Sequence, residues 1–291
     1  MRRRSYMLTN LDGTVSINFD NKTYTKSKLD LGSIDANLST YVGAGQAGQT
    51  ITARNYGTRD VVIEGYVLAD NEDEMRSRKS TLQKVIVPTT DFYLVVDNRY
   101  RLRITATSTL QYETDWYLNC ELLTKFTIEG TCSNPFFETT QEQQASITGW
   151  IKDFHFPYCN PVGQRFTFGH RSTSRIVDVR NESEVETGIV ISFKAVAGTI
   201  VNPSLMNVNT GETLTVNATL QSGETCEVNT GYGTKSCRNV TLDENWLQNV
   251  SLDSTWLQMP VGISSFRYDF DESSTGTLEC DVYYTPQLIE V

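Results

Sequence analysis

The sequence has few of the residues and motifs that support catalysis or metal binding. Among its 291 residues are only two histidines, and its six cysteines lie far apart with no C-x-x-C pair. Zinc sites usually show closely spaced ligands, so we expect no bound metal. The chain also lacks a G-x-S-x-G elbow, an H-E-x-x-H motif and a P-loop. We therefore expect no enzyme, no catalytic residue and no cofactor.

One enzymatic alternative stays open. The two acids of a glycosidase need not be adjacent in sequence, so a β-sandwich glycosidase is compatible with this composition, although the sequence nominates no pair. The histidines, His155 and His170, lie in an aromatic stretch of the chain. Packing or hydrogen bonding fits them better than a role as catalytic base.

Long apolar runs and a cationic surplus are missing as well. No run of eighteen apolar residues is present, which excludes a transmembrane helix, and no apolar core follows the arginines at residues 2–4, so we expect no export signal. Residues 1–140 carry 16 Lys and Arg against 17 Asp and Glu, and residues 141–291 carry 9 against 18. Gripping a phosphate backbone requires clustered cations, so we expect no specific nucleic-acid binding.

Alternation of apolar and polar residues dominates what is present, as is typical of half-buried strands. Residues 100–106 alternate cleanly, and the link Asp97-Asn98 joins them to a second alternating run at 92–96. Both link residues tolerate positive φ, which predicts a tight hairpin. Trp116, Leu118, Cys120 and Leu122 repeat the pattern and predict a further strand.

One helix is expected among these strands, over residues 71–85. Asp70 or Asn71 can cap it, acidic residues fill its first turn, and Pro88 ends it. No helical periodicity follows residue 146, where strands and turns recur at the spacing of a β-sandwich. The predicted fold is mainly β: a sandwich- or barrel-like first domain with one α-helix, then an antiparallel β-sandwich.

A proline-marked seam at 134–138 and a polar stretch at 138–146 separate the two halves. The polar stretch has little to bury and is interpreted as a linker. We therefore assign residues 1–140 to a first domain and residues 141–291 to a second.

Three glycines, Gly43, Gly45 and Gly48, match the G-x-G-x-x-G string of dinucleotide-binding proteins. That chemistry requires a helix directly after the glycines, whereas residues 49–54 have the pattern of a strand. We interpret the segment as a flexible loop or hairpin tip. In an oligomer such a loop would let a neighbouring backbone approach closely, which makes these glycines candidate oligomer contacts.

Two further sets of residues suggest binding surfaces. Arg99, Arg101 and Arg103 form a basic face on one strand, which is either solvated and paired within the chain or a contact between subunits. Trp246 and Trp256 lie in a short repeat with a spacing of ten. They either anchor turns of the sandwich or stack on sugar rings, as in a carbohydrate-binding surface module.

The order of several short motifs is similar to that of a known family. In the first half they are 10–13, 56–65, 82–88 and 132–138; in the second they are 188–191, 198–203, 209–212, 223–224 and Gly262. Together they resemble the distal tail proteins of long non-contractile-tailed (siphovirus) bacteriophages, over nearly the whole chain. One departure is Asn229, which stands where the family has an acidic residue.

The resemblance implies a structural role in the virion. It implies that the first domain forms a hexameric ring joining the tail tube protein to the tail hub at the phage tail tip. The second domain would be a galectin-like β-sandwich outside the ring, part of a baseplate that supports receptor-binding proteins for host attachment. Such a protein is assembled in the bacterial host cytoplasm and has no membrane partner. A carbohydrate-binding surface module remains the alternative.

Overall fold

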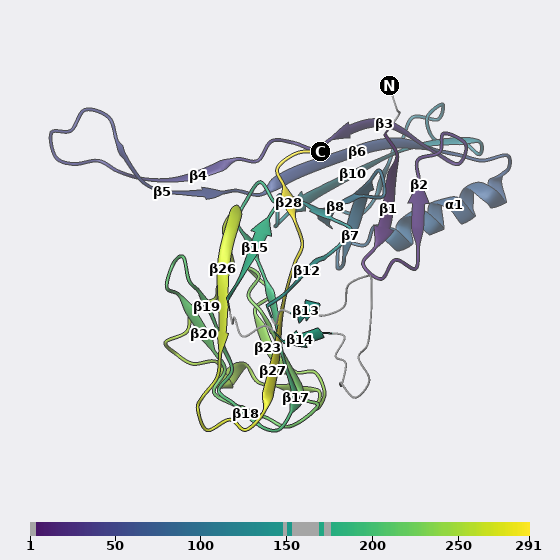
Figure 1. Ribbon diagram of the computed structural model, residues 1–291. Coiled ribbons are helices and arrows are strands. Elements are labelled where there is room, and N and C mark those ends of the chain that lie inside the picture. Colours follow the sequence, from purple (N-terminus) through teal and green to yellow (C-terminus); the bar gives the residue numbers. More distant parts are fainter. Residues whose placement is uncertain (1–3, 148–149, 153–168, 172–175) are drawn as a thin grey trace, which may run out of the picture. The chain divides into compact units, whose positions relative to one another are not determined.

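The computed structural model describes residues 4–147, 150–152, 169–171 and 176–291. It divides into two compact units, Met1–Thr140 with Leu288–Val291, and Gln141–Gln287. The last four residues, assigned above to the second domain, belong to the first unit. Both units consist of antiparallel strands, and the one α-helix of the described residues lies in the first (Figure 1). The predicted mainly β fold is confirmed.

The first unit has one large antiparallel sheet, with helix α1 packed against its strands β1 and β6, and a separate two-stranded hairpin. Along the sheet the strands are β2 (Ser16–Asn18), β1 (Tyr6–Asn10), β7 (Asp91–Val96), β8 (Tyr100–Ala106), β10 (Leu123–Cys132), β6 (Arg59–Leu68) and β3 (Tyr24–Asp30). Three short strands extend it: β9 (Gln111–Tyr112), β11 (Phe137–Thr139) and β28 (Gln287–Leu288).

The longest ladder of this sheet joins β6 to β10. It runs without interruption from the pair Leu68–Leu123 to the pair Arg59–Cys132. Alternate residues of both strands are buried, and the Phe126 ring fills the space over Gly65. A Cβ added to Gly65 would lie 2.6 Å from the carbonyl oxygen of Thr25 and 2.7 Å from Cζ of Phe126. Only glycine fits there without displacing its neighbours.

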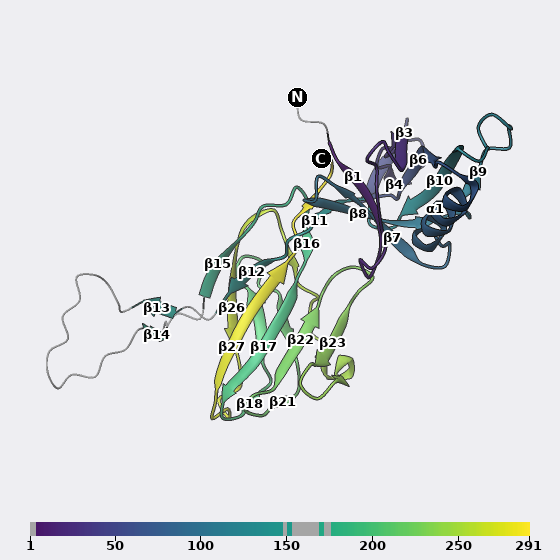
Figure 2. The same ribbon diagram turned by 90° about the vertical axis from the view of Figure 1, so that its right-hand side faces the viewer.

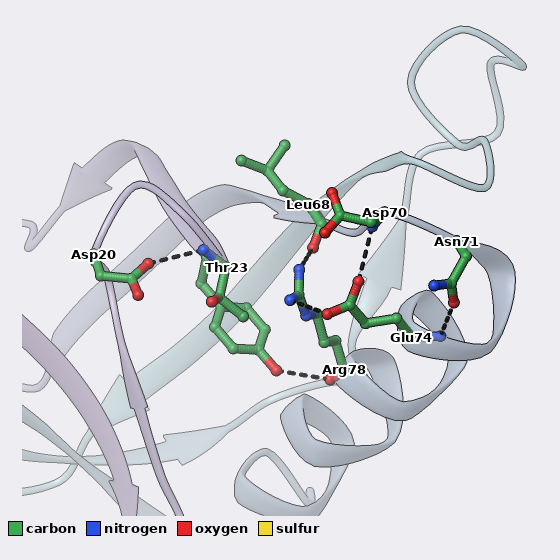
Figure 3. Close-up of polar contacts among 8 residues, drawn as sticks. Asp20, Thr23, Leu68, Asp70, Asn71, Glu74 and Arg78 are labelled. Carbon is green, nitrogen blue, oxygen red and sulfur yellow. Dashed lines mark hydrogen bonds and ion pairs between the residues drawn. The ribbon is translucent and has the colours of Figure 1, made fainter.

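Helix α1 (Glu72–Val85) begins at the predicted cap. The Asn71 side chain accepts a hydrogen bond from the Glu74 backbone N–H at 2.9 Å, which satisfies one of the amides left free in the first turn (Figure 3). Its apolar stripe, Met75, Leu82 and Val85, is buried in the core. The helix therefore covers the sheet with the residues that the sequence pattern indicates.

Polar contacts also fix the start of α1 on the sheet. The Arg78 guanidinium donates to the carbonyl oxygen of Leu68 at the end of β6 and pairs with Glu74 (Figure 3). Glu74 in turn accepts from the backbone N–H of Asp70 at 2.8 Å. The hydroxyl of Tyr24 donates to the Arg78 carbonyl oxygen at 3.0 Å, so strand β3 also contacts the helix at Arg78.

The predicted hairpin of β7 and β8 is present, with Asp97 and Asn98 at φ of 52° and 54°. Its link is one residue longer than the predicted pair, because Val96 pairs with Tyr100 and Arg99 joins the turn. At the other end of the hairpin, Asp91 accepts hydrogen bonds from the Thr105 hydroxyl at 2.6 Å and from Arg103 Nε at 2.7 Å. The Thr105 hydrogen bond and the Arg103 guanidinium lower the pKa of Asp91 below its ordinary value, while partial burial opposes them.

The second unit is a sandwich of two antiparallel sheets, the galectin-like arrangement that the resemblance implies (Figure 2). One sheet orders β12 (Gln143–Ser146), β27 (Thr277–Tyr284), β17 (Val190–Ala197), β22 (Thr225–Asn229), β23 (Ser236–Asn239) and β24 (Glu244–Asn245). The other orders β15 (Ile176–Asn181), β26 (Gly262–Asp269), β19 (Ser204–Asn207) and β20 (Thr213–Thr215). Their facing apolar side chains form one core.

Smaller elements complete this unit. Three strand pairs join β16 (Thr187–Gly188) to β25 (Gln258–Met259), β18 (Ile200–Val201) to β21 (Thr219–Leu220), and β13 (Trp150–Lys152) to β14 (Gly169–Arg171). A 3-10 helix spans Leu247–Asn249. Neither this turn nor α1, the helices of the described residues, is long and apolar enough to cross a membrane.

Two local predictions are wrong. The run from Trp116 to Leu122 is not a strand but a series of turns, in which Trp116 is 83% exposed and Cys120 is exposed rather than buried. The polar stretch after Phe137 is not a plain linker, because it contributes β11 to the first unit and β12 to the second. Polar residues make these two strands hard to recognise in the sequence. Strand β12 is mostly exposed, and β11 consists of the buried Phe137 followed by two half-buried polar residues.

The last residues return to the first unit and are held there by polar and apolar contacts. The buried Arg59 side chain donates to the carbonyl oxygen of Ile289 at 2.6 Å and lies over the Phe137 ring at 5.2 Å. Arg4 donates to the carbonyl oxygen of Val291, and the side chains of Leu288 and Val291 pack against the core. Burial lowers the pKa of Arg59 from its ordinary value, and the nearby Cys132 and Glu290 oppose this shift only in part.

The close packing at Gly65 predicts a stability effect. We expect Gly65→Ala to destabilise the first unit by about 1–3 kcal/mol, because the added methyl overlaps backbone and ring atoms. Urea unfolding followed by fluorescence measures this. Gly43→Ala is the control and should change stability by less than about 0.5 kcal/mol. Its only tight contact would be the flexible end of Gln46 at 3.2 Å, and the Tyr41 ring would lie at an ordinary 3.7 Å. Equal midpoints for the two variants would refute the packing argument.

The contacts of Asp91 predict a pH dependence. Its folded pKa lies below the ordinary value, so its contribution is present above the unfolded pKa and is lost as pH falls through the folded pKa. Between about pH 5 and about pH 2, wild type should lose more unfolding free energy than Asp91→Asn does. Asp12→Asn, which removes an exposed carboxylate of the same unit, should follow wild type. An Asp91→Asn curve parallel to wild type would contradict this.

Candidate interaction surfaces

A β-hairpin projects from the first unit and is its most exposed element (Figure 1). Its strands, β4 (Ala36–Tyr41) and β5 (Thr50–Tyr56), pair only with each other, and every residue in both is exposed. We call residues 36–56 the arm. Two-stranded hairpins without a covering surface are marginally stable in water. The arm has two exposed strands that no other described strand of the first unit pairs with.

The root of the arm is fixed by close backbone contacts. The Gly57 N–H donates to the carbonyl oxygen of Asp35 at 2.6 Å. Gly32 has φ of 58°, and a Cβ there would lie 2.3 Å from the carbonyl oxygen of Asp60. The Tyr56 ring packs edge-on against Phe136, with centroids 5.0 Å apart. These contacts set the direction in which the arm leaves the sheet.

The arm has one apolar face. Tyr56 pairs with Ala36, Arg54 with Leu38 and Ile51 with Thr40, so these side chains share one side of the ladder. A bulge leaves Thr52 unpaired, and this shift brings Ile51 onto the side of Leu38. Leu38, Ile51 and Tyr56 are 51%, 41% and 59% exposed. The opposite side carries mostly polar residues.

The predicted glycine loop forms the tip of the arm. Gly45 and Gly48 have φ of 76° and 81°, and a Cβ on either would meet no atom within 4 Å. The Gly43 N–H donates to the side-chain oxygen of Gln46 at 3.0 Å, which closes the turn. Strand β5 follows directly, so the nucleotide-binding alternative is wrong and the hairpin-tip interpretation is confirmed. A role in oligomer contacts remains a prediction.

Two of the three arginine candidates form ion pairs within the chain. Arg101 pairs with Glu138 at 3.1 Å and lies over the Tyr93 ring at 5.0 Å, while Arg103 pairs with Asp91. Arg99 is exposed in the β7–β8 turn. The geometry favours the solvated and paired interpretation for Arg101 and Arg103; a subunit contact of this face stays a prediction.

The two tryptophans are only partly exposed. Both pack against the core of the second unit. Trp246 Nε1 donates to Glu244 at 3.0 Å, and the ammonium group of Lys235 lies 5.3 Å from the Trp256 ring. These contacts fit the anchoring interpretation. Sugar stacking by Trp246 or Trp256 stays untested.

The chain offers little for metal or thiol chemistry where it is described. Within those residues, no three His, Cys, Asp or Glu side chains gather in a metal-binding cluster. Cys226 and Cys237 lie 3.8 Å apart in the core as free thiols. His170 lies in β14, whereas His155 lies outside the described residues.

A second exposed surface escaped the sequence analysis. Residues 113–122, the aromatic loop, lie between β9 and β10, and three apolar side chains point outward from it: Trp116, Tyr117 and Leu122, 83%, 57% and 55% exposed. Asp115, directly before the alternating run, and Asn119, within it, both favour turns. These two residues are the sequence signal for a loop.

Two protein-family models match the chain, one in each unit. A family model described as a phage tail protein RIFT-related domain matches residues 4–129, and one described as a siphovirus-type tail component, C-terminal domain, matches residues 182–287. No curated protein sequence matches the chain.

Two solved structures share the fold. The crystal structure of Dit of phage SPP1, titled a paradigm of hub adsorption apparatus in phages infecting Gram-positive hosts, has a TM-score of 0.66 at 12% identity, covering 97% of this chain and 98% of that one. A chain of the phage P2 baseplate in its activated conformation with Ca has a TM-score of 0.56 at 9% identity, with 100% of both chains covered. With both models matching in order over most of its length, the chain belongs to the distal tail protein family of siphovirus-type bacteriophages.

Proposed function

We propose that this structural tail component assembles into a closed ring, most simply a hexamer, that joins the tail tube to the hub and supports receptor-binding proteins. Two observations support this role. The chain belongs to the distal tail family, and its fold is similar to that of a hub protein of phage SPP1 and a baseplate protein of phage P2. The protein acts by holding other proteins and not by catalysis. It is assembled in the cytoplasm of the bacterial host and remains in the virion tail tip.

The arm is the observation that carries the proposal. Its apolar face exposes Leu38, Ile51 and Tyr56, although fully burying one such side chain contributes about 1.5–3 kcal/mol. No surface of its own chain covers this face within the described residues, apart from the contact of Tyr56 with Phe136. A neighbouring copy is the partner always present during assembly. A contact between two different surfaces of identical chains repeats from copy to copy and closes into a ring when the rotation allows.

The ring proposal predicts that the apolar face of the arm is required for assembly. Wild type should form a ring-sized oligomer in gel filtration with light scattering, alone or with its hub partner. Leu38→Thr combined with Ile51→Thr should shift the mass toward the monomer, because threonine keeps the strand but removes the apolar face. Circular dichroism should stay unchanged.

A matched control lies on the other face of the same hairpin. Ser39 and Ala53 are opposite each other, and replacing both with Thr should leave the oligomer intact. Negative-stain electron microscopy would show the rings directly. A wild-type protein that is monomeric under all conditions, with or without the hub protein, would refute the proposal.

A further inference from the structure

We infer that the aromatic loop of one copy receives the apolar face of the arm of the next. This assignment rests on the proposed ring and names the two surfaces that meet in it. Trp116, Tyr117 and Leu122 form the acceptor site. Leu38, Ile51 and Arg54 form the face of the arm that inserts into it.

The aromatic loop has a fixed shape although its side chains are exposed. The Lys125 N–H donates to the carbonyl oxygen of Leu118 at 2.7 Å, and the Cys120 N–H donates to that of Leu123 at 2.8 Å. The Lys79 ammonium of α1 donates to the side-chain oxygen of Asn119 at 3.1 Å. A loop held in this way loses little conformational entropy on binding.

The exposed side chains have the character of a binding hot spot. Trp116 and Tyr117 pack edge to face, with ring centroids 6.0 Å apart, and Leu122 is exposed in the same loop. Clustered tryptophan and tyrosine side chains carry much of the binding energy in protein interfaces. Exposed apolar clusters on soluble proteins commonly mark interaction sites.

Charge selects the arm as the occupant. The arm contains one cation, Arg54, and no Asp or Glu, and Arg54 lies on the apolar face opposite Leu38. The aromatic loop contains Glu113, Asp115 and Glu121 and no Lys or Arg. An arm against a loop therefore pairs opposite charges, whereas arm against arm or loop against loop would place like charges together.

The two surfaces lie at opposite ends of the β6–β10 ladder. The arm leads into Arg59 of β6, which pairs with Cys132, whereas the aromatic loop leads into Leu123 of β10, which pairs with Leu68. The ladder has ten residue pairs, so its two ends lie roughly 30 Å apart along the strands. Figure 1 shows the arm leaving the first unit on the side away from α1, and Figure 2 shows β9 beside α1. One chain presents donor and acceptor on opposite sides, as head-to-tail assembly requires.

Photo-crosslinking tests the assignment directly. Trp116 is replaced by the photoreactive residue p-benzoylphenylalanine, and light and ¹⁵N-labelled copies are assembled together before irradiation. Trypsin releases the loop within residues 104–125 and most of the arm within residues 29–54. We expect crosslinks between these two peptides that combine one light and one heavy partner.

The outcomes separate this inference from the ring proposal. Rings whose mixed-isotope crosslinks lead to other segments, or only to another tail protein added to the mixture, would overturn the loop assignment and leave the ring standing. A wild-type protein that never assembles would overturn both. Crosslinks found within single copies alone would also reject the assignment.

Charge reversal provides an independent readout. Arg54→Glu should raise the concentration of half-assembly about tenfold, since close charge pairs across interfaces couple strongly. Adding Glu113→Lys and Glu121→Lys to the same chain should restore assembly. Lys194→Glu, an equal charge change at an exposed site of the second unit, is the control. Loss of assembly without rescue by the loop lysines would count against the pairing.

Discussion

The ladder between β6 and β10 is the constraint on which the first unit depends. Its uninterrupted pairing fixes the register of two strands whose ends lead into every notable feature of the unit. The arm enters at one end of β6, helix α1 follows the other end, and the aromatic loop feeds into β10. A slip of one residue would turn the buried side chains of either strand to the opposite face. Gly65 and its covering Phe126 ring oppose such a slip, because the contact fits only in this register.

The sequence indicates this frame because its strands follow simple rules. Alternation identifies β7 and β8, the Asp97-Asn98 link identifies a tight hairpin, and Asn71 identifies the start of the helix. Each of these signals is local. They fail where apolar residues alternate without being buried, as from Trp116 to Leu122, and where polar residues pair as strands, as in β12.

The candidate surfaces were only half accessible from the sequence. The glycines at 43–48 marked the arm tip, but its apolar face depends on a bulge that shifts Ile51 by one position, and no residue pattern announces that shift. For the arginines, the sequence shows the residues themselves but not their partners. Their alternation was visible, whereas their partners Glu138 and Asp91 lie on neighbouring strands and appear only once the strands are paired. A local sequence pattern does not identify pairing partners that lie far apart in the chain.

The return of residues 288–291 to the first unit makes the whole second unit an insertion between Thr140 and Leu288. Both ends of the inserted unit connect to the first unit, which serves as the frame. The hydrogen bond from Arg59 to the Ile289 carbonyl oxygen joins the two chain segments of this frame. The frame can therefore keep its core while the inserted module is lengthened, shortened or exchanged, as surface insertions generally allow. A tail protein with this topology can exchange the inserted module while the frame stays unchanged.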